Sequence, residues 1–125
     1  MISEWDQAIG RHHHPNAHLS AVLYLTGSGS GAEGVFRLHA MNQPNELVAG
    51  LAVGYGGPID EDHPLNQSHW DLAPRPGLLV LFPSCLQHSV LPNDDPDQLR
   101  CSISFDFVLT APEQGGYPEY LAPDP

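Results

Sequence analysis

The chain has 125 residues and a mass of 13.6 kDa, which is enough for one domain with a single core. Four basic and fifteen acidic side chains give a formal net charge of −11, so nucleic acid and anionic membranes are excluded as expected partners. Thirteen prolines and twelve glycines interrupt most stretches of the sequence, which favours short strands joined by turns over long helices.

The sequence offers few signals for targeting. The first ten residues, MISEWDQAIG, contain no basic start and no apolar core, so they predict no secretory signal. No stretch approaches the roughly 20 apolar residues that a membrane-spanning helix needs. The two cysteines, Cys85 and Cys101, are not spaced like paired metal ligands. We therefore expect reduced thiols in a cytoplasmic protein with no membrane association.

Several segments have the composition of strands, because apolar residues run together or alternate with polar ones between turn residues. In chain order they are residues 18–26, 34–40, 46–55, 77–83, 88–92 and 99–109. The first two are joined by the flexible connection GSGSGAEG. The polar segment 56–77 is long enough to predict a functional loop, and we expect a mobile cover over a site. Residues 111–125 predict an irregular tail after a single domain at residues 1–110.

The last predicted strand alternates most regularly. One face carries four polar residues and the other four apolar ones: Arg100, Ser102, Ser104 and Asp106 against Cys101, Ile103, Phe105 and Phe107. Many short strands with Gly and Pro turns and no helical period predict an all-β sandwich or barrel, with the jelly roll among the candidates.

Four of the eight histidines lie in RHHHPNAH, residues 11–18. On an extended segment His12 and His14 project to the same face while His13 points away, so two imidazoles can take adjacent positions on one metal ion. The best candidate for a third ligand is His88 in FPSCLQHSVLPN, after the most hydrophobic strand. Arg100 opens the final strand, and we expect that strand to pair antiparallel with the His88 segment and face the same interior.

The residues alone leave alternatives open. The histidine cluster could be a solvated loop with incidental imidazoles. The ligand register could instead use His14 with Asn16, which would be a weak or absent third ligand. Arg100 could simply neutralise Asp106 on the same strand face.

The order of the motifs resembles the Fe(II)/2-oxoglutarate-dependent oxygenases, and most closely a group of small members of that superfamily. The resemblance rests on HxHPNxH followed by LS-V-YL, on PG-L-LFPS followed by H-V-PN, and on R-SISF, and spans roughly residues 5–107. It implies a double-stranded β-helix, the jelly-roll or cupin-like fold, with few or no helices. It also implies that His12, His14 and His88 hold Fe(II).

The same resemblance implies that Arg100 forms a salt bridge with the far carboxylate of 2-oxoglutarate, because an arginine fork matches a carboxylate. Ser102 and Tyr24 would add hydrogen bonds to that carboxylate. The implied reaction consumes O₂ and decarboxylates 2-oxoglutarate to succinate and CO₂ while hydroxylating a small molecule or peptide of unknown identity. No catalytic residue is expected beyond the metal ligands.

Two features depart from the pattern of the superfamily. His14 stands where most members carry a carboxylate ligand, and only eleven residues precede the first ligand. Either this is a minimal barrel or a second subunit, in a homodimer, covers its exposed face. The first rival function is a cupin-like metal enzyme with the same three histidines that does not use 2-oxoglutarate. The second is a metal- or ligand-binding β-domain without catalysis. A buried cation opposite the metal, supplied by Arg100, separates the oxygenase from its rivals.

Overall fold

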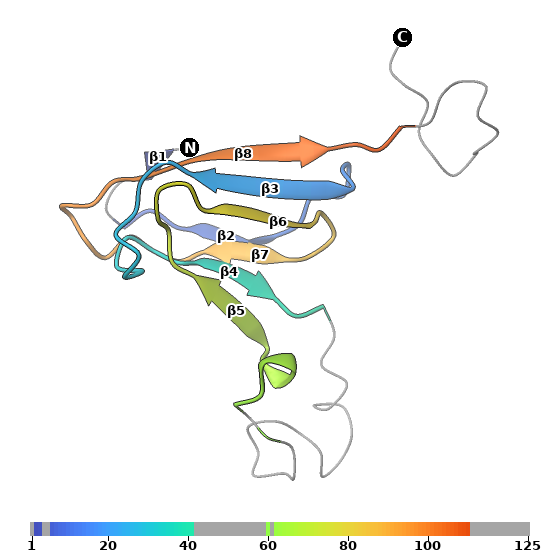
Figure 1. Cartoon of the computed structure of the whole chain (residues 1–125), viewed down its shortest axis with the longest axis horizontal. Helices are drawn as coiled ribbons and strands as arrows, with labels where there is room; N and C mark the ends of the chain where they lie inside the picture. Colours follow the sequence, from blue (N-terminus) through green and yellow to red (C-terminus); the bar gives the residue numbers. More distant parts are fainter. Residues whose placement is uncertain (1, 4–5, 42–59, 61, 111–125) are drawn as a thin grey trace.

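The computed structural model describes residues 2–3, 6–41, 60 and 62–110. This part of the chain forms two four-stranded antiparallel sheets, which lie one above the other in Figure 1. The first sheet has the strand order β1 (Ile2–Ser3), β8 (Arg100–Phe107), β3 (Leu19–Tyr24) and β6 (Leu79–Pro83). The second has the order β2 (Ile9–His12), β7 (His88–Val90), β4 (Phe36–His39) and β5 (His69–Leu72).

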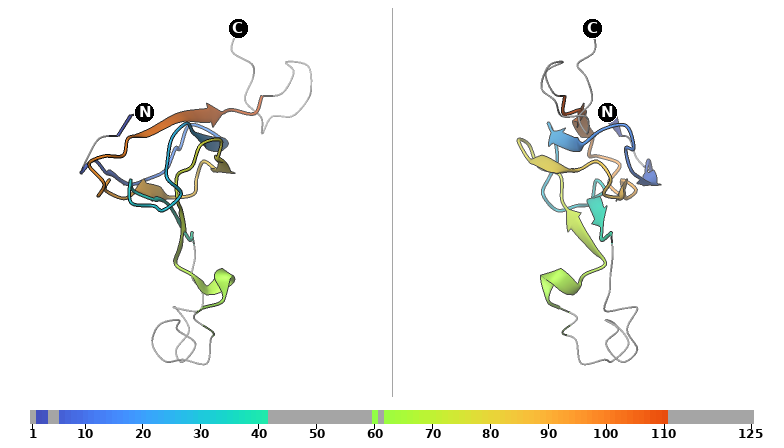
Figure 2. Two further views of the ribbon diagram at one scale, coloured as in Figure 1. Left: turned by 60° about the vertical axis from the view of Figure 1, so that its left-hand side comes forward. Right: turned by 90° about the vertical axis from the view of Figure 1, so that its right-hand side faces the viewer.

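The chain passes back and forth between the two sheets. Apart from the β4–β5 pair, consecutive strands belong to opposite sheets, so each sheet is assembled from strands far apart in the sequence. Figure 2 shows the two layers from two further directions. This arrangement is the double-stranded β-helix, and it confirms the fold class expected from the sequence. The only helical element in the described residues is the 3-10 turn Pro64–Asn66, and no described helix has the length and apolar character to span a bilayer.

Two expectations about local structure are wrong. Strand β8 does not pair with β7 but with β1 and β3, because β7 and β8 lie in opposite sheets. The segment 56–77 is not one continuous loop, since it contains the 3-10 turn and the strand β5, which pairs with β4. The predicted strand at 46–55 and the tail at 111–125 lie outside the described residues, as do residues 56–59 and 61 of the segment expected to cover the site. That this segment is a mobile cover stays a prediction.

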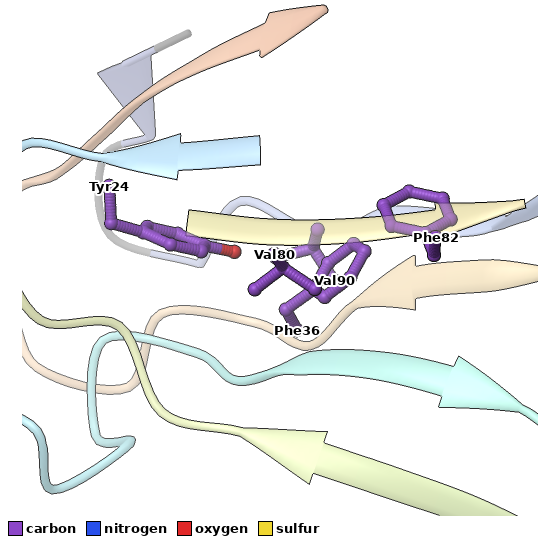
Figure 3. Packing of buried hydrophobic residues seen from close by; sticks show 5 residues of the cluster. All are labelled: Tyr24, Phe36, Val80, Phe82 and Val90. Atoms are coloured by element: carbon purple, nitrogen blue, oxygen red, sulfur yellow. The ribbon is translucent and has the colours of Figure 1, made fainter. Parts of the chain in front are cut away.

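The core lies between the sheets and draws on both of them (Figure 3). Tyr24 from β3 and Val80 and Phe82 from β6 extend from the first sheet. Phe36 from β4 and Val90 from β7 meet them from the second. Period-2 alternation on each strand therefore aims one row of side chains at this interior. The same interior holds the candidate site.

The outward face of the first sheet is apolar. Leu79 and Leu81 on β6 are 59 % and 60 % exposed, and Ile103, Phe105 and Phe107 on β8 are also exposed. The polar face of β8 points inward instead, which is the reverse of the usual arrangement for a half-buried strand. The expected homodimer stays a prediction.

Candidate metal centre

A β-bulge in β2 brings the first histidine into the site. Ile9 pairs with Val90 and His12 with His88, so the two residues between them in β2, Gly10 and Arg11, stand opposite the single residue Ser89 of β7. Without the extra residue, Arg11 would stand opposite His88, and His12 would face outward. The bulge reverses the alternation so that both Ile9 and His12 face the interior, which is a common use of bulges beside functional sites.

The structure brings His12, His14 and His88 together, with one potential ligand nitrogen from each ring within 4.8 Å of the others. The ring centroids of His12 and His88 are 4.3 Å apart, and that of His14 lies 5.3 Å from His12 and 5.1 Å from His88. His13 is exposed, as the alternation predicted, and Asn16 is also exposed and does not belong to the group. The group that forms in the structure is therefore that of the His12 and His14 register, and it does not include Asn16.

All three rings are fixed through the same nitrogen. His12 Nδ1 lies 2.7 Å from the carbonyl of Gly10, and His88 Nδ1 lies 3.0 Å from that of Leu86. His14 Nδ1 lies 2.9 Å from Asp106 Oδ2. Because carbonyls and carboxylates only accept, each Nδ1 must carry the proton. Each Nε2 is then left with its lone pair, which is the form of imidazole that binds a metal.

His88 is the deepest of the three ligands. It is 4 % exposed, and its ring packs at 4.8 Å from that of Phe82 and 5.6 Å from that of Phe36. Burial, with a smaller effect from the neighbouring His12 and His14, holds the pKa of His88 below its ordinary value. This side chain is therefore kept in the neutral, metal-binding form near neutral pH.

Sequence reasoning missed a group of residues behind His14. Asp106 Oδ1 accepts a hydrogen bond of 2.6 Å from Ser20 Oγ, and Ser20 Oγ lies 2.8 Å from Ser84 Oγ. The alternation of β8 already placed Asp106 on the inward face, but nothing local showed that its partner would be His14. The alternative in which Asp106 neutralises Arg100 does not hold, since six residues along a strand separate the two by about 20 Å.

Arg100 lies at the other end of β8 and is 3 % exposed. Its Nη1 donates to the backbone carbonyls of Glu33, Gly34 and Leu91 at 3.2, 3.3 and 3.4 Å. Its Nη2 is the only buried side-chain nitrogen or oxygen in the described residues that has no hydrogen-bond partner. Burial lowers the pKa of Arg100, although an arginine stays charged in a protein. A buried cation with one unsatisfied donor fits an incoming carboxylate.

Tyr24 and Ser102 lie between these two ends and pair with each other across β3 and β8. Tyr24 is 2 % exposed, and its hydroxyl points along the interior toward Val80 and Val90 (Figure 3). Burial raises the pKa of Tyr24 to about 12, while the charge of Arg100 opposes that rise. The tyrosine therefore stays a neutral hydroxyl that can donate or accept a hydrogen bond.

A cavity of about 210 Å³ lies in this interior. It is lined by the three histidines, by Tyr24 and by mainly apolar side chains of both sheets. Arg100 and Ser102 are not among its lining residues. The donor set of the histidines fits a divalent transition metal, and the unsatisfied Arg100 Nη2 fits a carboxylate.

The fold and the three-histidine group together define a metal-site protein of the double-stranded β-helix class. Within this class, the chain belongs to the family described as "Putative 2OG-Fe(II) oxygenase", whose model matches residues 1–106. The family consists of oxidoreductases that use Fe(II), 2-oxoglutarate and O₂, which confirms the resemblance seen in the sequence. No curated protein matches the chain significantly.

Solved structures share the fold at low sequence identity. A prolyl-4-hydroxylase from Pseudomonas putida has a TM-score of 0.55 and 22 % identity, over 86 % of this chain and 50 % of its own. An oxidoreductase of the 2OG-Fe(II) oxygenase family from Burkholderia pseudomallei has a TM-score of 0.52 and 19 % identity, over 82 % and 38 %. The α-ketoglutarate-dependent epimerase SnoN from nogalamycin biosynthesis has a TM-score of 0.55 and 15 % identity, over 82 % and 44 %. The chain thus spans half or less of each of these proteins.

Proposed function

We propose that this chain is an Fe(II)- and 2-oxoglutarate-dependent dioxygenase that hydroxylates its substrate. One observation carries the proposal: a single interior holds three imidazoles with available Nε2 atoms and a buried arginine with an unsatisfied Nη2. A metal-binding domain without a 2-oxo acid has no use for the second feature. The membership in the oxygenase family supports the same reading.

In this proposal His12, His14 and His88 would hold Fe(II) through Nε2. When bound, Fe(II) with 2-oxoglutarate and O₂ supplies the oxidising power for hydroxylation, while the 2-oxo acid is converted to succinate and CO₂. Arg100 would bind the far carboxylate of 2-oxoglutarate, and Tyr24 and Ser102 would donate hydrogen bonds to it.

The protein's own contribution is to orient these groups and to exclude water. Phe36, Phe82 and Val90 line the cavity between the two ends and keep it apolar. Such surroundings strengthen the interaction of Arg100 with a carboxylate, because solvent does not screen it. We further propose a neutral or cationic small molecule or peptide as substrate, on account of the net charge of −11, and a cytoplasmic location.

The test is succinate formation by the wild-type protein. We expect the protein with Fe(II), ascorbate and 2-oxoglutarate to release succinate slowly in the absence of a hydroxylation substrate. Under anaerobic conditions the same mixture should develop the weak visible absorption of an Fe(II) chelate with the 2-oxo acid. A protein that binds Fe(II) but neither binds nor consumes 2-oxoglutarate would instead support the rival three-histidine, cupin-like function.

A further inference from the structure

The three histidines differ in what supports them. His12 and His88 each donate Nδ1–H to a backbone carbonyl two residues earlier in the chain, at Gly10 and Leu86. His14 alone donates to a charged side chain, Asp106, at 2.9 Å. A carboxylate acceptor polarises an imidazole more than a neutral carbonyl does, which makes the opposite nitrogen a stronger metal donor.

Asp106 is held in place by a closed ring of hydrogen bonds. A carboxylate cannot donate, so Ser20 Oγ must give its proton to Asp106 Oδ1 at 2.6 Å. Ser20 Oγ can then only accept from Ser84 Oγ, at 2.8 Å. The carbonyl of Ser84 in turn accepts the backbone N–H of His14 at 2.9 Å, which closes the ring.

This ring joins four separate parts of the chain. Ser20 lies on β3 directly opposite Asp106 on β8, Ser84 follows β6, and His14 follows β2. Ser20 is 2 % exposed and Ser84 is 0 % exposed, so both hydroxyls need partners inside the protein. Both hydroxyls have such a partner. Because the Asp106 carboxylate can only accept, Ser20 donates to Asp106 and Ser84 donates to Ser20.

From this geometry we infer that Asp106 is a positioning residue that orients His14 and supplies the metal centre with the negative charge that its three neutral ligands lack. The inference rests on the metal centre of the proposed function and deepens it. Asp106 does not belong to the group of potential ligands, and each of its oxygens accepts a hydrogen bond, from His14 or from Ser20. It acts through the imidazole, as a carboxylate behind a metal-binding histidine commonly does.

The test compares Asp106→Asn with Ser20→Ala and with the control Ser104→Ala. Asparagine keeps the shape of the side chain, and its amide can accept from His14 and donate to Ser20, so it removes the charge with little change in contacts. Ser20→Ala keeps the charge and removes one of the hydrogen bonds that hold the carboxylate. Ser104 lies on the same strand, two residues from Asp106, and also lines the cavity.

We expect Asp106→Asn to weaken Co(II) binding about 10-fold, at the lower end of the roughly 10- to 100-fold range for such partners, and to shift the visible d–d bands of Co(II). The lower end is expected because the Asp106 side chain is 43 % exposed and solvent screens its charge. Ser20→Ala should weaken binding less, and Ser104→Ala should match the wild type. Thermal unfolding of each metal-free variant measures the structural contribution separately.

The inference is overturned if Asp106→Asn binds Co(II) with the affinity and spectrum of the wild type. It is also overturned if that variant only lowers the unfolding midpoint while the folded fraction binds Co(II) normally, because Asp106 is then purely structural. A wild type that binds Co(II) but makes no succinate removes the proposed oxygenase activity without touching the role of Asp106. A wild type that binds no Co(II) removes both.

Discussion

The two ends of the interior differ in how completely their polar side-chain atoms are hydrogen-bonded. At the metal end, the Nδ1 of every histidine has an acceptor, and the ring behind His14 satisfies two buried serines as well. At the arginine end, Arg100 Nη1 reaches three carbonyls while its Nη2 has no partner. The Nδ1 positions at the metal end thus all have partners within the protein, whereas the arginine end keeps one buried donor that a bound carboxylate would satisfy. Substitutions at the arginine end should therefore leave metal affinity unchanged, and substitutions at the metal end should leave the contacts of Arg100 unchanged.

The largest effect is expected at the metal end, from His88→Ala. Removing the most buried of three ligands should weaken Fe(II) or Co(II) binding by more than the roughly 10- to 100-fold that loss of a supporting hydrogen bond costs. Anaerobic metal titration followed by absorption is the measurement. His13→Ala is the matched control, since His13 is exposed and should keep full affinity. Loss of metal from His13→Ala with retention by His88→Ala would contradict the assigned ligands.

Next in size is the loss of the carboxylate partner in Arg100→Ala. One charge-assisted hydrogen bond from the unsatisfied Nη2, at about 1.5 to 3 kcal/mol, corresponds to about a 10- to 100-fold loss of 2-oxoglutarate affinity. Metal affinity should stay near that of the wild type, because Arg100 contacts none of the histidines. Arg100→Lys should recover only part of the loss, since an ammonium supplies charge without a planar fork. Calorimetric titration of 2-oxoglutarate into the Co(II)-loaded variants tests the comparison, and equal affinities in all three proteins would refute it.

The third effect is on stability rather than on ligand binding, and it comes from the backbone that holds Arg100. Gly34 has a φ of +91°, and a Cβ there would collide with Arg100 Nη1 and with the carbonyl of Leu91. Gly29 has a φ of +78° but has open space around it, so Gly29→Ala isolates the conformational strain alone. We expect Gly29→Ala to cost about 1 kcal/mol of unfolding free energy and Gly34→Ala about 2 to 4 kcal/mol, as overlap adds to strain. Urea denaturation measures the unfolding free energy of both variants. Equal losses of stability would show that the overlap of a Cβ at position 34 with Arg100 and Leu91 costs nothing.

The smallest effect concerns pH and the metal-free protein. Burial lowers the pKa of His88 in the folded state, so between that pKa and the unfolded value of about 6.5 the unfolded chain binds more protons. The contribution of His88 to stability is therefore complete above about pH 6.5 and is lost as the pH falls through the folded pKa. Urea denaturation with a chelator at about pH 7.5 and about pH 5.5 should show this decline, and His88→Gln should reduce it. If the stability of His88→Gln falls by the same amount between these two pH values, groups other than His88 cause the decline.

Much of the site was predictable because it depends on local alternation. The spacing of His12 and His14, the position of His88 after an apolar strand and the inward face of β8 all follow from period-2 geometry. The same alternation correctly placed Arg100 on the inward face and His13 outside. What the alternation could not predict was the bulge in β2. Gly10 is a residue type common at bulges, but where the register shifts depends on the pairing with β7.

The sequence by itself therefore determined the all-β class, the three histidines of the candidate metal centre and the residues of β8 that face the interior, since these depend on composition and on a periodicity within each strand. Only the tertiary structure decided which strands are neighbours. It placed β7 and β8 in opposite sheets, so that His88 and Arg100 face a common interior without being paired. It also brought Asp106 to His14 across 92 positions of the chain and left Arg100 Nη2 unsatisfied. Such contacts arise because the chain crosses back and forth between the two sheets. No local sequence pattern shows which distant side chains will meet as a result.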